Sequence, residues 1–218
     1  MNGSTWFCFR LTRWVILGAF ASQASLSSAE IVFQDIEDVP LFRGFPYVFY
    51  SVDFNQDGTE DAVFRSSEAE FRVISTPTSE IAGLVSPPPN IGNNARPFHT
   101  GEMIESSLTD PWSWNSGEST LIACRDIGCL GFWGSNIDYV GVQFTIDGNT
   151  HYGWVEVEVP FIGVNGGYVR SFAYETEVGA PIIAGAIPEP SASVLILIGI
   201  GVAITFHRRR KRRNKALQ

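Results

Sequence analysis

The sequence predicts an all-β fold, an antiparallel β-sandwich or jelly-roll-like domain, followed by a single C-terminal transmembrane helix. Aromatic, glycine and β-branched residues dominate the middle of the chain, and long stretches with apolar residues at helical spacing are missing there. Short alternating runs bounded by turn residues take their place, as in antiparallel sheets. The transmembrane helix is indicated by an uncharged apolar run near the C-terminal end.

The first 29 residues have the three parts of a secretory signal peptide. Arg10 and Arg13 form a charged n-region, and Trp14–Ala21 forms a short apolar h-region. Ser27-Ser28-Ala29 offers small side chains for cleavage, with Ala24 as a second possible cleavage point. The apolar run is too short to remain as a membrane anchor. We therefore expect residues 1–29 to be removed.

Residues 30–187 form the expected mature domain, and this domain is strongly acidic. Nine of the 15 lysines and arginines lie in the two terminal segments, whereas every acidic residue except Glu189 lies between them. The domain has six basic and 22 acidic residues, a net charge near −16, whereas the whole chain has −8. Such a surface repels nucleic acid and anionic lipid and attracts divalent cations. Nucleic-acid binding is therefore excluded.

Alternation and β-branched content predict several strands in this domain. They are Tyr47–Val52, Ala62–Arg65, Glu70–Ser75, Thr120–Ala123, Tyr139–Ile146, Gly153–Val159 and Tyr168–Tyr174.

The clearest pair of strands is a hairpin around Asp147-Gly148-Asn149, which supplies turn residues. Apolar and polar residues alternate over 140–146 before the turn and again after it. On the return strand, the valines are predicted to face the core. Trp154, Glu156 and Glu158 share the opposite face, which we expect to meet solvent.

An acidic run between two predicted strands has the spacing of a calcium loop. Oxygen-bearing side chains stand at its first, third, fifth and ninth positions: Asp53, Asn55, Asp57 and Asp61. Gly58 allows the sharp turn, and Thr59 could offer a backbone carbonyl. The bidentate acid of the twelfth position is replaced by Phe64, so the run departs from an EF-hand. It resembles the Asp-x-Asn-x-Asp-Gly hairpin loops of secreted β-proteins and predicts a weak or structural Ca²⁺ site; the alternative is a polar turn.

Two cysteines, Cys124 and Cys129, are expected in the mature domain, because Cys8 leaves with the signal peptide. An even pair in an oxidising compartment predicts a disulfide, which would add about 2 kcal/mol for so short a loop. Zinc is the alternative, but it prefers four ligands and this pair supplies two.

Evidence for a catalytic site is weak in the mature domain. Its histidines are His99 and His151, and neither stands in a Gly-x-Ser-x-Gly elbow or a His-Glu-x-x-His motif. His151 lies near the hairpin turn and is predicted to be a surface residue. Four tryptophans could stack on sugars or pack the core: Trp112, Trp114, Trp133 and Trp154. We therefore expect no enzyme activity, with a carbohydrate-active hydrolase as the alternative.

The chain ends in a polar tripeptide, an apolar run and a basic block. The tripeptide is Pro188-Glu189-Pro190, and Ser191–Phe206 would span about 24 Å as a helix. The basic block follows at once: Arg208, Arg209, Arg210, Lys211, Arg212 and Arg213. A positive flank holds its end of a membrane helix in the cytoplasm. A buried core helix is the alternative for an apolar run of this length.

These parts, in this order over residues 188–213, resemble the PEP-CTERM sorting signal of bacterial envelope proteins, a segment also labelled "ice-binding protein C-terminal domain". The runs 151–157, 173–176 and 179–185 are similar to the end of many PEP-CTERM β-domains. The resemblance implies that an exosortase, a membrane-embedded cysteine protease, cuts near the tripeptide and releases or transfers the upstream domain.

Together these features predict a secreted protein of the cell envelope or extracellular matrix. It would be held by a single membrane pass and then released, with exosortase as a partner. We expect its acidic β-domain to have a structural or binding role in association with extracellular polysaccharide.

Overall fold

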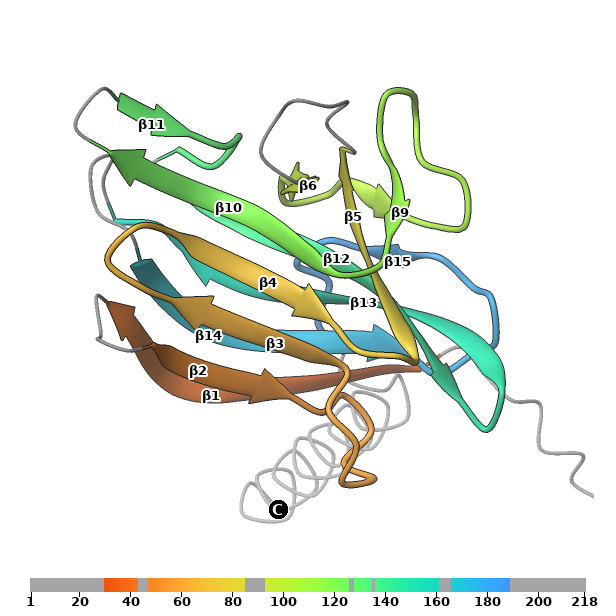
Figure 1. Cartoon of the computed structure of the whole chain (residues 1–218). Helices are drawn as coiled ribbons and strands as arrows, with labels where there is room; N and C mark the ends of the chain where they lie inside the picture. The colour runs from red at the N-terminus through yellow and green to blue at the C-terminus, as the bar shows by residue number, and fades with distance from the viewer. Residues whose placement is uncertain are drawn as a thin grey trace, which may run out of the picture.

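Figure 1 shows the computed structural model of the chain, which describes residues 30–42, 47–84, 93–125, 128–134, 136–160 and 166–188. The expected signal peptide, Glu189, Pro190, the apolar run and its basic flank lie outside these residues. No helix capable of crossing a membrane occurs in the described ranges.

The described residues form strands and loops and no helix, which confirms the all-β class. The strands are β1 (Ile31–Phe42), β2 (Val48–Val52), β3 (Ala62–Ser66), β4 (Phe71–Ser75), β5 (Ser79–Leu84), β6 (Asn93–Ala95), β7 (Pro97–Phe98), β8 (Met103–Ile104), β9 (Ser113–Asn115), β10 (Glu118–Arg125), β11 (Gly128–Leu130), β12 (Ile137–Ile146), β13 (Asn149–Glu158), β14 (Gly166–Glu175) and β15 (Ile182–Ile183). Every predicted strand overlaps one of them. The long β1 and the central β5 were not predicted.

Most strands belong to one sheet, in the order β1-β14-β13-β12-β5-β6-β10-β4-β3-β2. The sheet folds over so that β2, β3, β4 and β10 form a front layer and β1, β14, β13 and β12 a rear layer (Figure 1). Its two end strands, β1 and β2, contact each other, so the sheet is nearly closed. The two layers of the expected sandwich are therefore two halves of one continuous sheet.

A phenylalanine-rich core fills the space between the two layers. Phe54, from the loop after β2, stacks on Phe144 of β12 with ring centroids 4.7 Å apart, and its edge meets Phe172 of β14 at 5.5 Å. Phe64 and Phe71 join the same cluster from the front layer. Because aromatic rings bury large areas, this packing contributes strongly to the hydrophobic stabilisation of the nearly closed sheet, here also called the barrel.

A second cluster covers the outer face of the rear layer and corrects the predicted position of Trp154. This side chain is only 1% exposed and lies among Tyr139, Ile104 and Ile182. The residues come from β12, β8 and β15, and the last two form a small separate sheet against β13. Alternation correctly separates the two faces of β13, but it cannot show that an earlier strand, β8, and a later strand, β15, cover one of them.

Candidate binding site around the acidic loop

The acidic loop, Asp53–Asp61, connects β2 to β3 and is shaped by its own side chains. Gln56 and Gly58 adopt positive φ angles of 58° and 87°, which turn the backbone inward. The Asp53 carboxylate accepts hydrogen bonds from the backbone N–H groups of Asp57 at 3.2 Å and Gly58 at 2.8 Å. This arrangement is an Asx-type turn, in which a carboxylate satisfies the backbone of the following residues.

Asp57 repeats this pattern at the exposed tip of the loop. Its carboxylate accepts the Asn55 side-chain amide at 2.8 Å and the Thr59 backbone N–H at 2.7 Å. These two donors favour the charged form and hold the pKa of Asp57 below its ordinary value.

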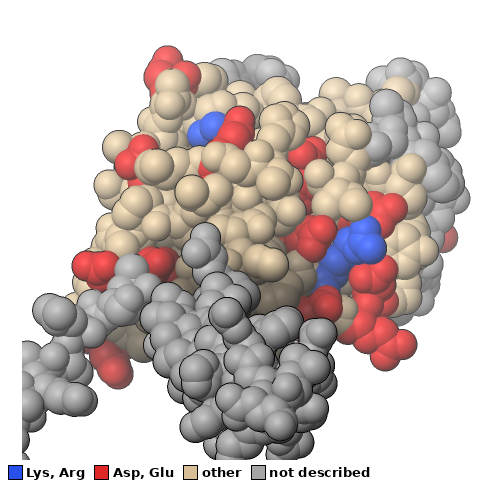
Figure 2. All heavy atoms as spheres, turned by 180° about the vertical axis from the view of Figure 1, so that it is seen from behind, with Lys and Arg blue, Asp and Glu red and all other residues tan. Residues whose placement is uncertain are grey.

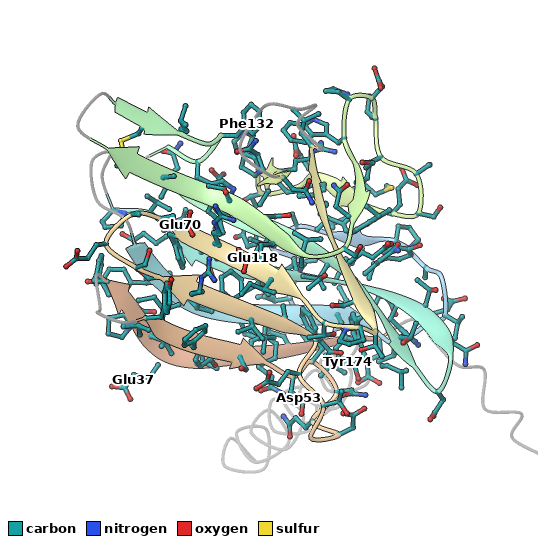
Figure 3. The ribbon with its side chains drawn as sticks, in the orientation of Figure 1. Glu37, Asp53, Glu70, Glu118, Phe132 and Tyr174 are labelled. Carbon is teal, nitrogen blue, oxygen red and sulfur yellow. A yellow bond between two sulfur atoms is a disulfide. The ribbon has the colours of Figure 1, made fainter. Side chains whose placement is uncertain are left out.

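Asp61 is the exception, because it turns into the protein and is only 4% exposed. Its carboxylate accepts the Phe54 N–H at 2.9 Å. Burial, assisted by the nearby charges of Asp53 and Asp57, raises the pKa of Asp61 to about 6, although the hydrogen bond from the Phe54 N–H opposes this shift. Burial and the charge of Asp61 likewise raise the pKa of Tyr174, which lies at the same end of the barrel as Asp53 (Figure 3).

The predicted calcium ligands Asp53, Asn55, Asp57, Thr59 and Asp61 thus share one loop, but they are arranged as a polar turn. No group of three or more acidic, histidine or cysteine side chains in the described residues is placed to hold a metal. No ion pair within the described ranges offsets the charge of the loop. The donor set is all oxygen, which suits Ca²⁺. Calcium binding by this loop therefore stays a prediction, and it rests on the oxygen donors of the loop.

A polar hollow of about 370 Å³ adjoins this loop. The two are joined by Ser79 at the start of β5, whose hydroxyl donates to the backbone oxygen of Asp61 at 2.5 Å and also lines the hollow.

A second charged group, here named the arginine cluster, lies on the front layer and consists of Arg65, Glu70, Arg72 and Glu118. Arg65 reaches Glu70 at 2.9 Å and Glu118 at 3.0 Å. Arg72 reaches the same two carboxylates at 2.6 and 2.9 Å. Figure 3 shows Glu70 and Glu118 close together on this layer. Two cations and two anions balance one another across β3, β4 and β10.

The cysteines lie on paired strands. Cys124 of β10 stands directly opposite Cys129 of β11. Their sulfur atoms are 2.09 Å apart, at bonding distance, and their Cα atoms are 4.0 Å apart.

The two histidines lie in different environments, and only His151 had a predicted position. His151 is 5% exposed, so its predicted surface position is wrong. Its Nδ1 lies 3.0 Å from the backbone oxygen of Glu175, the last residue of β14. His99 is exposed, and its Nδ1 lies 2.6 Å from the buried Asp138 carboxylate. No sequence pattern predicts the His99–Asp138 pair, because 38 residues separate its members and no motif links them.

The tryptophans do not gather on one exposed face. Trp154 and Trp133 are buried, and the Trp133 indole N–H donates to the Ala95 backbone oxygen at 3.2 Å. Trp114 packs on Tyr152 with ring centroids 5.7 Å apart. Trp112 meets the half-exposed Phe132 with ring centroids 5.1 Å apart, and the two rings form a small aromatic patch; Figure 3 shows Phe132 on the opposite side of the molecule from Asp53.

The described residues end at Pro188, the first residue of the predicted sorting tripeptide. Ala184 is buried and its N–H donates to the Glu102 backbone oxygen at 2.8 Å, whereas Ile187 is 59% exposed and Pro188 is exposed. The folded domain therefore leads into the tripeptide within a few residues.

Comparison with known proteins gives one finding for this end of the chain. Residues 186–213 match the family model of the PEP-CTERM protein-sorting motif. No curated protein and no solved structure matches the chain. The match agrees with the resemblance of residues 188–213 and supports processing by exosortase in the cell envelope. The chain therefore carries a PEP-CTERM protein-sorting motif at residues 186–213.

Proposed function

We propose that residues 30–187 form a non-enzymatic binding or structural domain, which exosortase releases from the membrane into the cell envelope or extracellular matrix, where it associates with extracellular polysaccharide. The observation that carries the proposal is the short connection between Ala184, buried in the domain, and the sorting motif that begins at residue 186. Cleavage there would free the domain with its C-terminal strand still paired.

The surface of the domain supports an extracellular role. On the face seen in Figure 2, lysine and arginine atoms appear only beside acidic atoms, and acidic atoms also stand alone. An acidic domain stays soluble, and it attracts divalent cations, for which the acidic loop supplies oxygen ligands.

The test of processing is mass spectrometry of the protein from its native host. The mature protein should begin near Glu30 and end close to Pro188–Pro190. In a strain without exosortase, the full C-terminal segment should stay with the membrane fraction. Intact peptides from Arg208–Arg213 in the extracellular fraction of the parent strain would contradict the proposal.

A carbohydrate-active hydrolase is the second candidate, and the His99–Asp138 pair is the observation that favours it. A buried carboxylate that orients an exposed imidazole is half of a general-base arrangement. A glycosidase would need two carboxylates across a substrate cleft. Release of reducing sugar from neutral polysaccharides, lost in an Asp138→Asn variant, would support the hydrolase. We expect no such release from the parent protein.

A further inference from the structure

The polar hollow lies on the outer face of the rear layer, where the second hydrophobic cluster stops. Gln143 and Glu80 are direct partners on β12 and β5, and Thr145 and Thr150 are direct partners on β12 and β13. Because alternate residues of a strand share a face, Gln143 and Thr145 point to the same side of the sheet. The outer face of β12 and β13 is therefore apolar and covered toward Trp154, and polar beside the hollow.

Most of the residues that line the hollow have side chains that donate or accept hydrogen bonds, and Pro77 and Phe144 are the apolar exceptions. Its walls include the hydroxyls of Thr76, Thr78, Thr145 and Thr150, together with Glu80 and Gln143. The amide of Gln143 donates to the carboxylate of Glu80, so these two groups hold each other in place. Hydroxyl groups can both donate and accept, which matches the hydroxyl groups of a sugar.

Charge restricts the ligand class. No lysine or arginine occurs among the residues that line the hollow, and the net charge of residues 30–187 is near −16. An anionic sugar would thus meet repulsion without a partner. A metal cation would find Glu80 as its single carboxylate. The hollow of about 370 Å³ is at the small end of the range for ligand sites, roughly 300–1,000 Å³.

Hydrogen bonds within the fold fix the positions of the residues that line the hollow. The Thr76 N–H donates to the Ser79 hydroxyl at 2.8 Å, and that hydroxyl donates to the Asp61 backbone oxygen at 2.5 Å. The backbone N–H of Thr145 donates to the Thr78 backbone oxygen at 3.0 Å. These bonds tie the β4–β5 turn both to β12 and to the acidic loop. A ligand therefore meets donors whose positions are already set, which lowers the entropy cost of binding.

We propose that this hollow binds one neutral sugar unit of an extracellular polysaccharide. The proposal rests on the proposed function and names the site through which the domain associates with its matrix. Binding of one unit by hydrogen bonds in an open hollow is weak. Repeated units on one polymer raise the apparent affinity, because a released domain rebinds the next unit.

The experiment is affinity electrophoresis of the full chain, kept soluble in mild detergent, through gels containing dextran, galactomannan, xyloglucan or anionic alginate. The parent protein should be slowed by at least one neutral polysaccharide and not by alginate. A Thr145→Val, Thr150→Val double variant should bind about tenfold more weakly, because it loses two hydroxyl groups and keeps their shape. The matched control, Thr100→Val with Thr109→Val, changes exposed threonines outside the hollow and should bind like the parent.

A Trp112→Ala, Phe132→Ala variant separates the hollow from the aromatic patch. Unchanged binding in the Thr145/Thr150 variant, with binding lost in the Trp112/Phe132 variant, would overturn the hollow and leave polysaccharide association in place. Slowing by alginate alone would overturn the neutral ligand class. If no gel slows the parent and it also fails to sediment with matrix from its host, both the hollow and polysaccharide association are wrong. Exosortase sorting is judged separately, from the termini of the mature protein.

Discussion

The acidic loop and the arginine cluster both gather charged side chains around β3, but their charges are balanced in different ways. In the arginine cluster, each guanidinium contacts Glu70 and Glu118, so opposite charges meet at 2.6–3.0 Å. In the acidic loop, Asp53 and Asp57 bind backbone N–H groups, and Asp61 is buried with a raised pKa. The difference teaches that backbone donors can position carboxylates without removing their mutual repulsion, whereas a matched cation does both.

The largest effect we expect is stabilisation of the acidic loop by calcium. A bound cation would offset the repulsion between the loop carboxylates, as the two arginines do in the arginine cluster. A cation that binds only the folded state adds about 2.7 kcal/mol at a hundredfold excess over its Kd. Thermal unfolding with millimolar calcium should give a higher Tm than unfolding with chelator.

An Asp57→Ala variant is the control for calcium. The calcium-dependent rise in Tm should disappear in it, because one ligand is lost. A rise that survives in the variant would place the site elsewhere. An unchanged Tm in the parent would mean that the loop is a plain polar turn.

The second effect concerns the arginine cluster. Glu118→Gln should lower the free energy of unfolding by about 2 kcal/mol, between the values for exposed and buried pairs, because two mostly buried guanidiniums would then share Glu70. Denaturant unfolding measures the change. Glu37→Gln, at an exposed position of β1, removes the same charge and should change stability little. If the two substitutions change the free energy of unfolding equally, the ion pairs of the arginine cluster add nothing beyond the effect of one charge on the net charge of the protein.

The third effect is a pH dependence from Asp61. Its pKa is about 6 in the folded state and 3.8 ordinarily, so the folded protein binds this proton more tightly than the unfolded chain. In chelator, the contribution of Asp61 should be most favourable below about pH 4 and should be lost as pH rises to about 6. We expect about 1–2 kcal/mol, because one pKa unit corresponds to about 1.4 kcal/mol and water screens part of the loop.

Asp61→Asn isolates this contribution from those of the other carboxyl groups. The difference in stability between the parent and Asp61→Asn should change over this pH window, with the parent losing stability relative to the variant as pH rises. A difference that is constant with pH would mean that Asp61 titrates normally.

The smallest effect is the response to salt, and its sign should differ between the two regions. Raising salt from about 0.1 M to about 1 M shortens the Debye length from about 10 Å to about 3 Å. Screening relieves repulsion in the acidic loop and weakens attraction in the arginine cluster. In chelator, salt should therefore stabilise Glu118→Gln more than the parent, and Asp57→Ala less than the parent. Identical salt responses in all three proteins would contradict the contrast.

Local patterns predicted the strands whose pairing is local. The β12–β13 hairpin has alternating residues on both sides of its turn, and it is present with Asp147 at φ 52° and Gly148 at φ 79°. By contrast, β1 carries Asp35, Glu37 and Asp38 and has a register shift between Asp35 and Val39. These acidic residues and Pro40 have low strand propensity and interrupt the apolar residues of β1, which is a strand because it pairs with β14, far away in sequence.

The candidate site shows the same division. The spacing of Asp53, Asp57 and Asp61 predicts one loop, because all three belong to a single turn. That Asp61 points inward and is braced by Ser79 depends on β5, which the sequence pattern did not reveal.

The sequence by itself determined the acidic charge of the domain, the cysteine pair, the acidic loop and the sorting motif, because each depends on composition or on the order of neighbouring residues. The tertiary structure alone decided that Trp154 and His151 are buried, that His99 meets Asp138, and that a polar hollow remains open beside Gln143. The physical reason is that burial depends on which distant segments cover a face. Here β8 and β15 cover one end of the outer face of the rear layer, and the other end stays polar.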